Sequence, residues 1–141
     1  MRRLLLLVLL ILGLAGCSRT PDEERIRAAI AAMEQAVEKR EPRAFMEHIA
    51  PDFIGTDASF DRAAMHNLMR AQFLGNQGIS VLLGPIEVNL QGERATAKMT
   101  ATLTGGSGGW IPERGAIYDI ESGWKRDGGE WQCISASWQQ R

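Results

Sequence analysis

Arg-Ala-Thr-Ala-Lys-Met-Thr-Ala-Thr-Leu-Thr, residues 94–104, alternates between apolar and polar side chains after its first residue. Side chains of a β-strand point to opposite faces in turn, so the alternation predicts a strand with one covered face and one polar face. The covered face is made mostly of small residues: Ala95, Ala97, Met99, Ala101 and Leu103. Such a face leaves room either for closely packed helices or for a cavity.

Strand-like segments continue on both sides of residues 94–104, and turn residues separate them. Gln91-Gly92 and Asp127-Gly128-Gly129 are typical of turns between antiparallel neighbours. We therefore expect at least two hairpins in the C-terminal half of the chain. The expected strands cover residues 79–83, 86–90, 94–104, 115–126 and 130–140.

The segment that precedes these strands has the period of helices. Thr20-Pro21-Asp22-Glu23 combines a capping threonine with proline at the first helical position. Apolar residues then recur at helical spacing, at Ile26, Ile30, Met33 and Val37. The pattern predicts a first helix of about five turns.

Two further helices are expected before the hairpins. Glu41-Pro42 begins the second helix, and Pro51-Asp52 ends it. Residues 53–56 then indicate a short strand. Asp61 is placed to cap a third helix, which ends at Gly75. The predicted order is therefore helices first and an antiparallel meander after them.

The beginning of the chain has the layout of a secretory signal. An arginine pair precedes an aliphatic run from Leu4 to Leu12, which is shorter than the roughly 20 residues that span a bilayer. Leu14-Ala15-Gly16-Cys17 resembles the lipobox of bacterial lipoproteins. The resemblance implies cleavage after residue 16 and diacylation of Cys17. The alternative is an ordinary signal peptide that leaves Cys17 as a free thiol.

The lipobox resemblance also implies a location in the cell. Acyl chains on Cys17 would hold the protein on a membrane of the bacterial cell envelope. Ser18 in place of aspartate points to the outer membrane, facing the periplasm, in a Gram-negative host. Residues 1–16 are then the signal peptide, 17–20 a short tether and 21–141 the folded domain. Three extended residues reach about 10 Å, so we expect the domain to lie close to the bilayer.

The charge of the chain argues against nucleic acid as a partner. The chain has 16 Lys and Arg against 17 Asp and Glu, and loss of Arg2 and Arg3 with the signal peptide leaves 14 against 17, a formal charge of −3. A mildly acidic domain provides no basic surface for a phosphate backbone. We therefore expect no nucleic-acid binding.

Neither a disulfide nor a cofactor site is expected. Lipidation of Cys17 would leave Cys133 without a partner thiol. The two histidines, His48 and His66, have no Cys/His spacing that would bind a metal. The run Gly105-Gly106-Ser107-Gly108-Gly109 lacks the Lys-Ser/Thr that follows a phosphate-binding loop. The sequence thus predicts no metal and no cofactor.

The last predicted strand carries two tryptophans, Trp131 and Trp138, an odd number of positions apart. In a regular strand they would point to opposite faces, so we expect at least one on the outer face of the sheet. A tryptophan there is either partly exposed or a subunit contact. A homodimer through the outer face is therefore one possible arrangement.

Three features, taken in order, resemble the nuclear-transport-factor-2-like superfamily. They are residues 44–53, the helix after Asp61, and the final hairpin at Asp127-Gly128-Gly129-Glu130-Trp131. The resemblance implies an α+β cone with three N-terminal helices packed on a curved antiparallel sheet and a pocket at the open end. Members include ketosteroid isomerases, polyketide cyclases, dehydratases, epoxide hydrolases and transport factors, so the fold does not decide the function.

The same resemblance implies candidate site residues. Asp57 falls where the isomerases place the aspartate that moves a proton, and an apolar pocket can raise the pKa of such a carboxylate. Aspartates in turns also accept backbone N–H groups, which is the structural alternative. In the first helix, the isomerases have a tyrosine that donates a hydrogen bond to the oxyanion, and the corresponding place here is near Met33. A methionine cannot donate this hydrogen bond, so we expect Met33 only to line the pocket. Tyr118 is expected to point inward, as a donor, a ligand contact or a core residue.

Two further residues complete the candidates. His66 lies beside the apolar stripe of the third helix and is either an acid–base group or a structural side chain. Trp110 follows the glycine-rich segment and is a candidate ligand contact at the mouth of the pocket.

Two classes of function remain open. One is a non-catalytic envelope lipoprotein whose cone binds a small apolar ligand or a partner protein. The other is an isomerase, dehydratase or hydrolase with Asp57 as general base and Tyr118 or His66 as donor. An enzyme needs polar groups that converge on one reacting atom, whereas a binding module needs only an apolar cavity.

Overall fold

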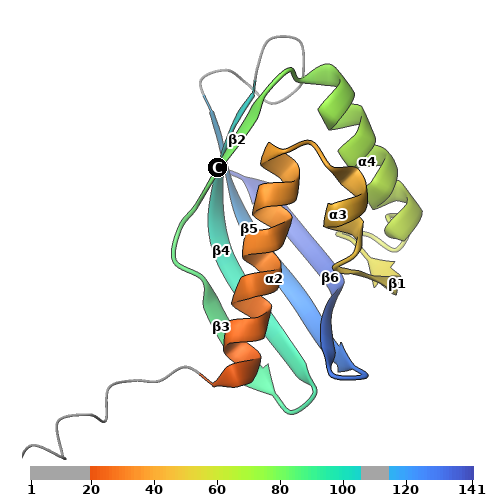
Figure 1. Cartoon of the computed structure of the whole chain (residues 1–141), viewed down its shortest axis with the longest axis vertical. Coiled ribbons are helices and arrows are strands. Elements are labelled where there is room, and N and C mark those ends of the chain that lie inside the picture. The colour runs from red at the N-terminus through yellow and green to blue at the C-terminus, as the bar shows by residue number, and fades with distance from the viewer. Residues whose placement is uncertain (1–19, 106–114) are drawn as a thin grey trace, which may run out of the picture.

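The computed structural model describes residues 20–105 and 115–141, and these residues form three helices and a six-stranded sheet (Figure 1). The predicted order of elements is confirmed. The bounds are α2 Pro21–Glu38, α3 Pro42–Met46, β1 Ile49–Ile54, α4 Arg62–Gly75, β2 Ile79–Leu83, β3 Glu87–Gln91, β4 Arg94–Gly105, β5 Ala116–Asp127 and β6 Glu130–Gln140.

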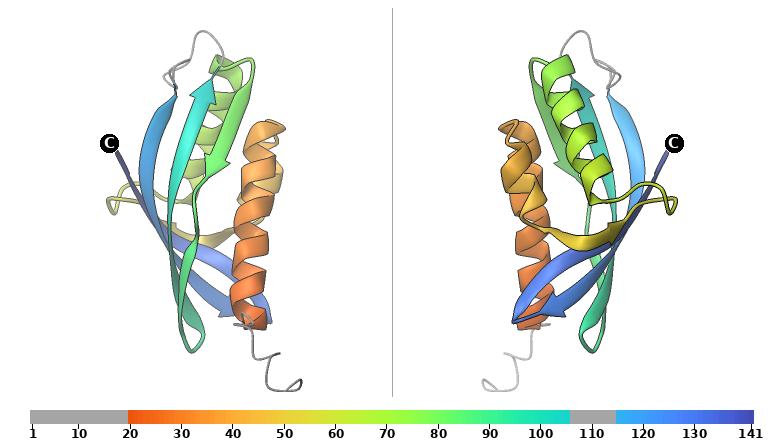
Figure 2. Two further views of the ribbon diagram at one scale, coloured as in Figure 1. Left: turned by 90° about the vertical axis from the view of Figure 1, so that its left-hand side faces the viewer. Right: turned by 90° about the vertical axis from the view of Figure 1, so that its right-hand side faces the viewer.

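The strands form one curved sheet in the order β1-β6-β5-β4-β2, and β3 also pairs with β4. The helices α2 and α4 lie on one face of this sheet (Figures 1 and 2). The α+β cone is confirmed, but the sheet is mixed rather than purely antiparallel, because β1 runs parallel to β6. A hairpin fixes the direction of each strand that it joins, whereas β1 meets β6 only after the rest of the chain has folded back.

Two predicted helix starts are confirmed by their capping contacts. Thr20 Oγ1 accepts a hydrogen bond from the Glu23 amide at 3.3 Å, and Asp61 Oδ1 accepts one from the Ala64 amide at 2.9 Å. Each bond satisfies an amide that has no partner within its own helix. The third helix ends at Gly75, as expected.

The second helix is shorter than expected, and the strand after it begins earlier. Helix α3 ends at Met46, and β1 already begins at Ile49. The prediction that the helix continues to Pro51 was therefore wrong. β1 is an edge strand, where proline is tolerated because its missing N–H does not interrupt the sheet.

A β-bulge interrupts the pairing of β5 with β6. Gly123 pairs with Ser135, but the next residue, Trp124, pairs with Cys133, so Ile134 is the extra residue. A Cβ atom at Gly123 would meet the Ser135 hydroxyl, so a larger residue opposite this point would require the Ser135 side chain to move aside. The inserted residue reverses the alternation of inward and outward side chains along β6.

The bulge overturns the prediction for the tryptophans. Trp131 lies before Ile134 in the buried core, and Trp138 lies after it and also packs against that core. Both rings therefore lie on the face that the helices cover, and the expected outward tryptophan was wrong. One inserted residue is enough to place two residues at an odd spacing on the same face of the sheet.

The end of the molecule where α2 begins is solidly packed. The β3–β4 and β5–β6 turns lie at the same end, which we call the hairpin end (Figure 1). Ile26 and Ala97 are fully buried in its core. Asp22 accepts a hydrogen bond from Trp131 Nε1 at 3.0 Å and pairs with Arg126 at 3.2 Å. These contacts fasten the start of α2 to the last hairpin.

Within residues 20–105 and 115–141, no helix combines the length and apolar character needed to cross a membrane. The same two segments contain no group of three or more His, Cys, Asp and Glu side chains placed to bind a metal ion. The predicted signal peptide, Cys17 and Trp110 lie outside the described residues.

Candidate functional site

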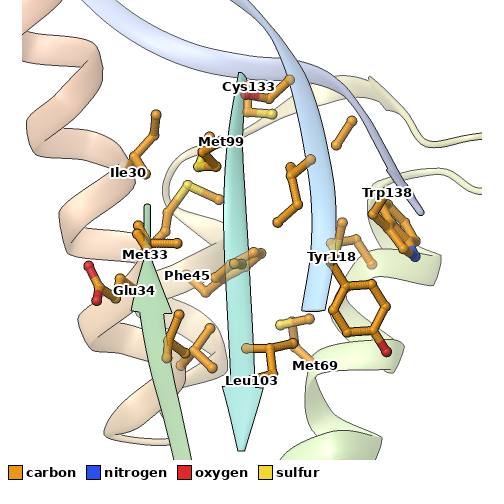
Figure 3. Close-up of a pocket in the computed structure, with 18 of the residues that line it drawn as sticks. Ile30, Met33, Glu34, Phe45, Met69, Met99, Leu103, Tyr118, Cys133 and Trp138 are labelled. Atoms are coloured by element: carbon orange, nitrogen blue, oxygen red, sulfur yellow. The ribbon is translucent and has the colours of Figure 1, made fainter. Parts of the chain in front are cut away.

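A cavity of about 230 Å³ occupies the half of the molecule remote from the hairpin end, and its lining is mostly apolar (Figure 3). It lies between the sheet and the helices, and α2, α3, α4, β1, β2, β4, β5 and β6 all contribute to its wall. Along α2 the wall begins at Ile30, whereas Ile26 belongs to the packed core. The cone is therefore filled at one end and hollow at the other.

The alanine-rich face of β4 serves both of the purposes that its sequence allows. Ala95 and Ala97 belong to the packed core at the hairpin end. Met99, Ala101 and Leu103 continue the same face and line the cavity. The small side chains thus allow close packing over the first half of the strand and leave space over the second.

Ser122 lines the cavity, but neighbouring groups of the protein engage its hydroxyl. The Ser122 hydroxyl accepts a hydrogen bond from Trp124 Nε1 at 2.9 Å and donates one to the Ala97 carbonyl oxygen at 3.3 Å. A buried hydroxyl that has both a donor and an acceptor partner costs little to bury, and its single proton is already in use. Ser122 therefore supports the buried Trp124 ring rather than presenting a donor to a ligand.

Two other polar side chains of the wall also bond within the protein. The Gln72 side-chain oxygen accepts a hydrogen bond from Asn76 Nδ2 at 3.4 Å. The Cys133 thiol donates to the Ser135 carbonyl oxygen at 3.2 Å, and burial raises the pKa of the thiol to about 12. Cys133 is therefore a neutral thiol at neutral pH and a poor nucleophile.

Met33 and Tyr118, two of the predicted ligand contacts, do line the cavity. Met33 comes from α2 and Tyr118 from β5, and Met69 and Trp138 belong to the same wall (Figure 3). Tyr118 is 5% exposed, and desolvation raises the pKa of its phenol. The ring is therefore neutral at physiological pH.

Glu34 is the one charged residue among the described side chains that line the cavity. It is partly exposed, and its pKa is raised, first by partial burial and then by repulsion from Glu38. The sequence analysis did not select it. A signal was present, because Glu34 stands four residues after Ile30 and therefore on the apolar face of α2.

Asp57 lies apart from the cavity, in the exposed turn between β1 and α4. Its carboxylate accepts hydrogen bonds from the Ser59 hydroxyl and from the Ser59 amide, the latter at 2.9 Å. The Ser59 hydroxyl, followed by the amide, lowers the pKa of Asp57. The position of Asp57 therefore fits the structural alternative, in which a turn aspartate accepts backbone N–H groups. It does not fit the role of a general base inside the cone.

His66 is partly buried on α4 and does not line the cavity. The structure therefore brings Met33 and Tyr118 to one cavity but places Asp57 and His66 elsewhere. Trp110, the remaining predicted contact, lies outside the described residues.

A second hollow, of about 750 Å³, includes polar residues of the outer face of the sheet. Lys98 pairs with Glu121 at 3.3 Å, and Arg141 pairs with Asp119 at 2.7 Å. Hydrogen bonding from Arg141 is the main cause that lowers the pKa of Asp119. These charges are partly neutralised by one another, and surface pairs of this kind contribute little to stability.

The fold class is that of known nuclear-transport-factor-2-like proteins with a cystatin-like fold. A protein of unknown function from Pseudomonas putida is similar, with 23% identity, a TM-score of 0.72, and coverage of 86% of this chain and 87% of that one. An uncharacterised protein from Caulobacter vibrioides has 19% identity and a TM-score of 0.70, with coverage of 84% and 89%. A candidate dehydratase from Streptomyces avermitilis has 16% identity and a TM-score of 0.72, with coverage of 86% and 99%.

The family model of the SnoaL-like domain matches residues 18–136, and the chain therefore belongs to the SnoaL-like domain family. A sequence search of curated proteins finds no match. The structural neighbours share less than a quarter of their residues with this chain, so their likeness extends to the fold alone.

Proposed function

We propose that this protein is a non-catalytic binding module of the bacterial cell envelope, and that its cavity binds a small apolar ligand. The observation that carries the proposal is the mostly apolar cavity of about 230 Å³, several of whose polar wall residues are already engaged within the protein. Ligand sites are mainly apolar hollows with a few polar groups at defined places. Catalysis would require polar groups that converge on a reacting atom.

The size of the cavity limits the ligand. An apolar cavity of about 150 Å³ is large enough to bind benzene, and pockets for drug-sized ligands begin at about 300 Å³. The volume of about 230 Å³ lies between these values. The expected ligand is therefore a one-ring or two-ring aromatic group, or a short alkyl chain.

Thermal unfolding of the mature protein with 2-naphthylmethanol tests this proposal. A ligand that binds only the folded state stabilises it by about 2.7 kcal/mol at a concentration one hundred times its dissociation constant, so the midpoint should rise with concentration. Glycerol at the same concentration is the polar negative control. An unchanged midpoint at the solubility limit of naphthyl and short alkyl compounds would contradict the proposal.

We also propose attachment to the outer membrane through a diacylated Cys17. Thr20, the first described residue, lies at the hairpin end, whereas the cavity lies in the opposite half. The anchored protein would then hold its packed end near the bilayer and its cavity toward the periplasm. Mass spectrometry of the mature N-terminus tests this: an unmodified Cys17 would contradict the anchor and leave the ligand proposal standing.

An enzyme of the isomerase, dehydratase or hydrolase class is the second candidate. Tyr118 favours it, because this phenol lines the cavity, and solved structures of similar fold include candidate dehydratases. The Tyr118→Phe substitution keeps the ring and removes the hydroxyl. Loss of turnover with unchanged ligand affinity would favour the enzyme, whereas a binding module should retain its affinity and show no turnover in either form.

A further inference from the structure

Glu34 stands at a border between the cavity and solvent. This side chain lines the cavity and is also partly exposed, and its carboxylate points outward from the apolar side chains (Figure 3). Val81 and Leu83 of β2 line the cavity as well and are likewise partly exposed. We call this border of the cavity, formed by α2 and β2, the rim.

A second carboxylate stands at the same rim. Glu38 follows Glu34 by four residues, which places the two on one face of α2, where like charges repel each other. Glu38 Oε1 accepts a hydrogen bond from the Val81 amide at 3.1 Å, which fixes Glu38 between α2 and β2. The rim therefore carries two acidic groups beside an apolar cavity.

No ion pair neutralises these carboxylates within the part of the chain that the structure describes. Arg40 follows α2, but its guanidinium donates to the carbonyl oxygens of Phe73 and Gln77. The pKa of Glu34 is raised by burial and by Glu38, and a cation at the rim would offset both effects.

We propose that the cavity prefers apolar ligands that carry a positively charged amine at one end. The inference rests on the proposed function, because it requires that the cavity bind an apolar group. The hydrocarbon part fills the cavity, and the ammonium group lies at the rim beside Glu34. A carboxylate on the same hydrocarbon is repelled there, so the rim discriminates between ligands of equal shape by their charge.

Three probes of matched shape test the inference by calorimetry at neutral pH: 2-naphthylmethanol, 2-naphthylmethylamine and 2-naphthoate. The amine should bind more tightly than the alcohol by up to about fivefold, the upper range for a partly exposed ion pair, and the carboxylate should bind most weakly. The Glu34→Gln substitution should reduce the preference for the amine. The Glu34→Lys substitution should reverse it, and Glu130→Gln, at the hairpin end, should leave it unchanged.

The outcomes separate the two proposals. If the alcohol does not bind to the wild-type protein, the proposed function fails and the charge preference fails with it. If the alcohol binds but the amine and the carboxylate bind equally, or if Glu34→Gln retains the full preference, the charge inference is overturned while the binding function stands.

Discussion

At the scale of single residues, the cavity wall shows how polar side chains can line an apolar site without entering its chemistry. Ser122 is held by Trp124 and the backbone, and Cys133 donates to a backbone carbonyl. A hydrogen bond made within the protein removes the need for a partner from the ligand. Glu34 differs because its charge remains at the border with solvent.

Cys133 gives a prediction for alkaline pH. Its folded-state pKa of about 12 lies above the ordinary value of 9.0, so folding favours the protonated thiol. The contribution of the protonated Cys133 thiol to the free energy of unfolding is fully present below pH 9 and is lost as the pH rises through about 12. Chemical denaturation between pH 8 and pH 11 should therefore show a steeper loss of stability for the wild type than for Cys133→Ala. Parallel losses in the two proteins would contradict the account of this thiol.

At the scale of elements, β4 connects the packed and the hollow parts of the cone. One face of this strand carries small side chains along most of its length, but the surroundings of this face differ between the two halves of the strand. The first half packs in the core with α2, and the second half borders the cavity. An added side chain should therefore have opposite consequences at the two ends of the same strand.

The substitutions Ala97→Leu and Ala101→Leu test this difference with the same change on the same face. Ala97 is 0% exposed in the packed core, so the larger side chain should lower the free energy of unfolding by about 1–3 kcal/mol. Ala101 lines the cavity, where leucine can enter empty space with little loss or a gain of stability. Urea denaturation of both variants measures the difference, and an equal loss would argue against an open cavity beneath Ala101.

Much of the fold could be predicted at this same scale, because alternation and turn residues are local signals. The bounds of β2, β4 and β6 follow from them to within one residue. The bulge at Ile134 could not be predicted, because one extra residue leaves the apolar composition unchanged while it reverses the faces. The parallel pairing of β1 also depends on distant partners rather than on its own sequence.

The site was predicted less completely than the fold. Met33 and Tyr118 follow from periodicity and from the family resemblance, and both line the cavity. Asp57 was selected by its place in the family pattern, but its carboxylate is engaged by a turn. Glu34 was overlooked because a carboxylate on a helix is usually solvated, and its place at the cavity depends on the packing of α2 against β2.

At the scale of the whole molecule, the cone has a filled end and a hollow end. A homodimer through the outer face of the sheet remains a prediction, and it no longer has an outward tryptophan to support it. The exposed Leu82 and Ile117 are each paired with Thr102 across that face. If copies associate there, Leu82→Lys should lower the mass measured by light scattering at high concentration, and a monomer in both proteins would contradict the dimer.

The central claim is that the hollow end binds a small apolar ligand. The most direct measurement is calorimetric titration of 2-naphthylmethanol into the wild-type protein and into Ala101→Leu, with circular dichroism to verify that both are folded. We predict saturable binding at one site in the wild type and its loss in the variant, because leucine at position 101 would occupy the cavity. No binding to the wild type, or equal binding to both proteins, would contradict the claim.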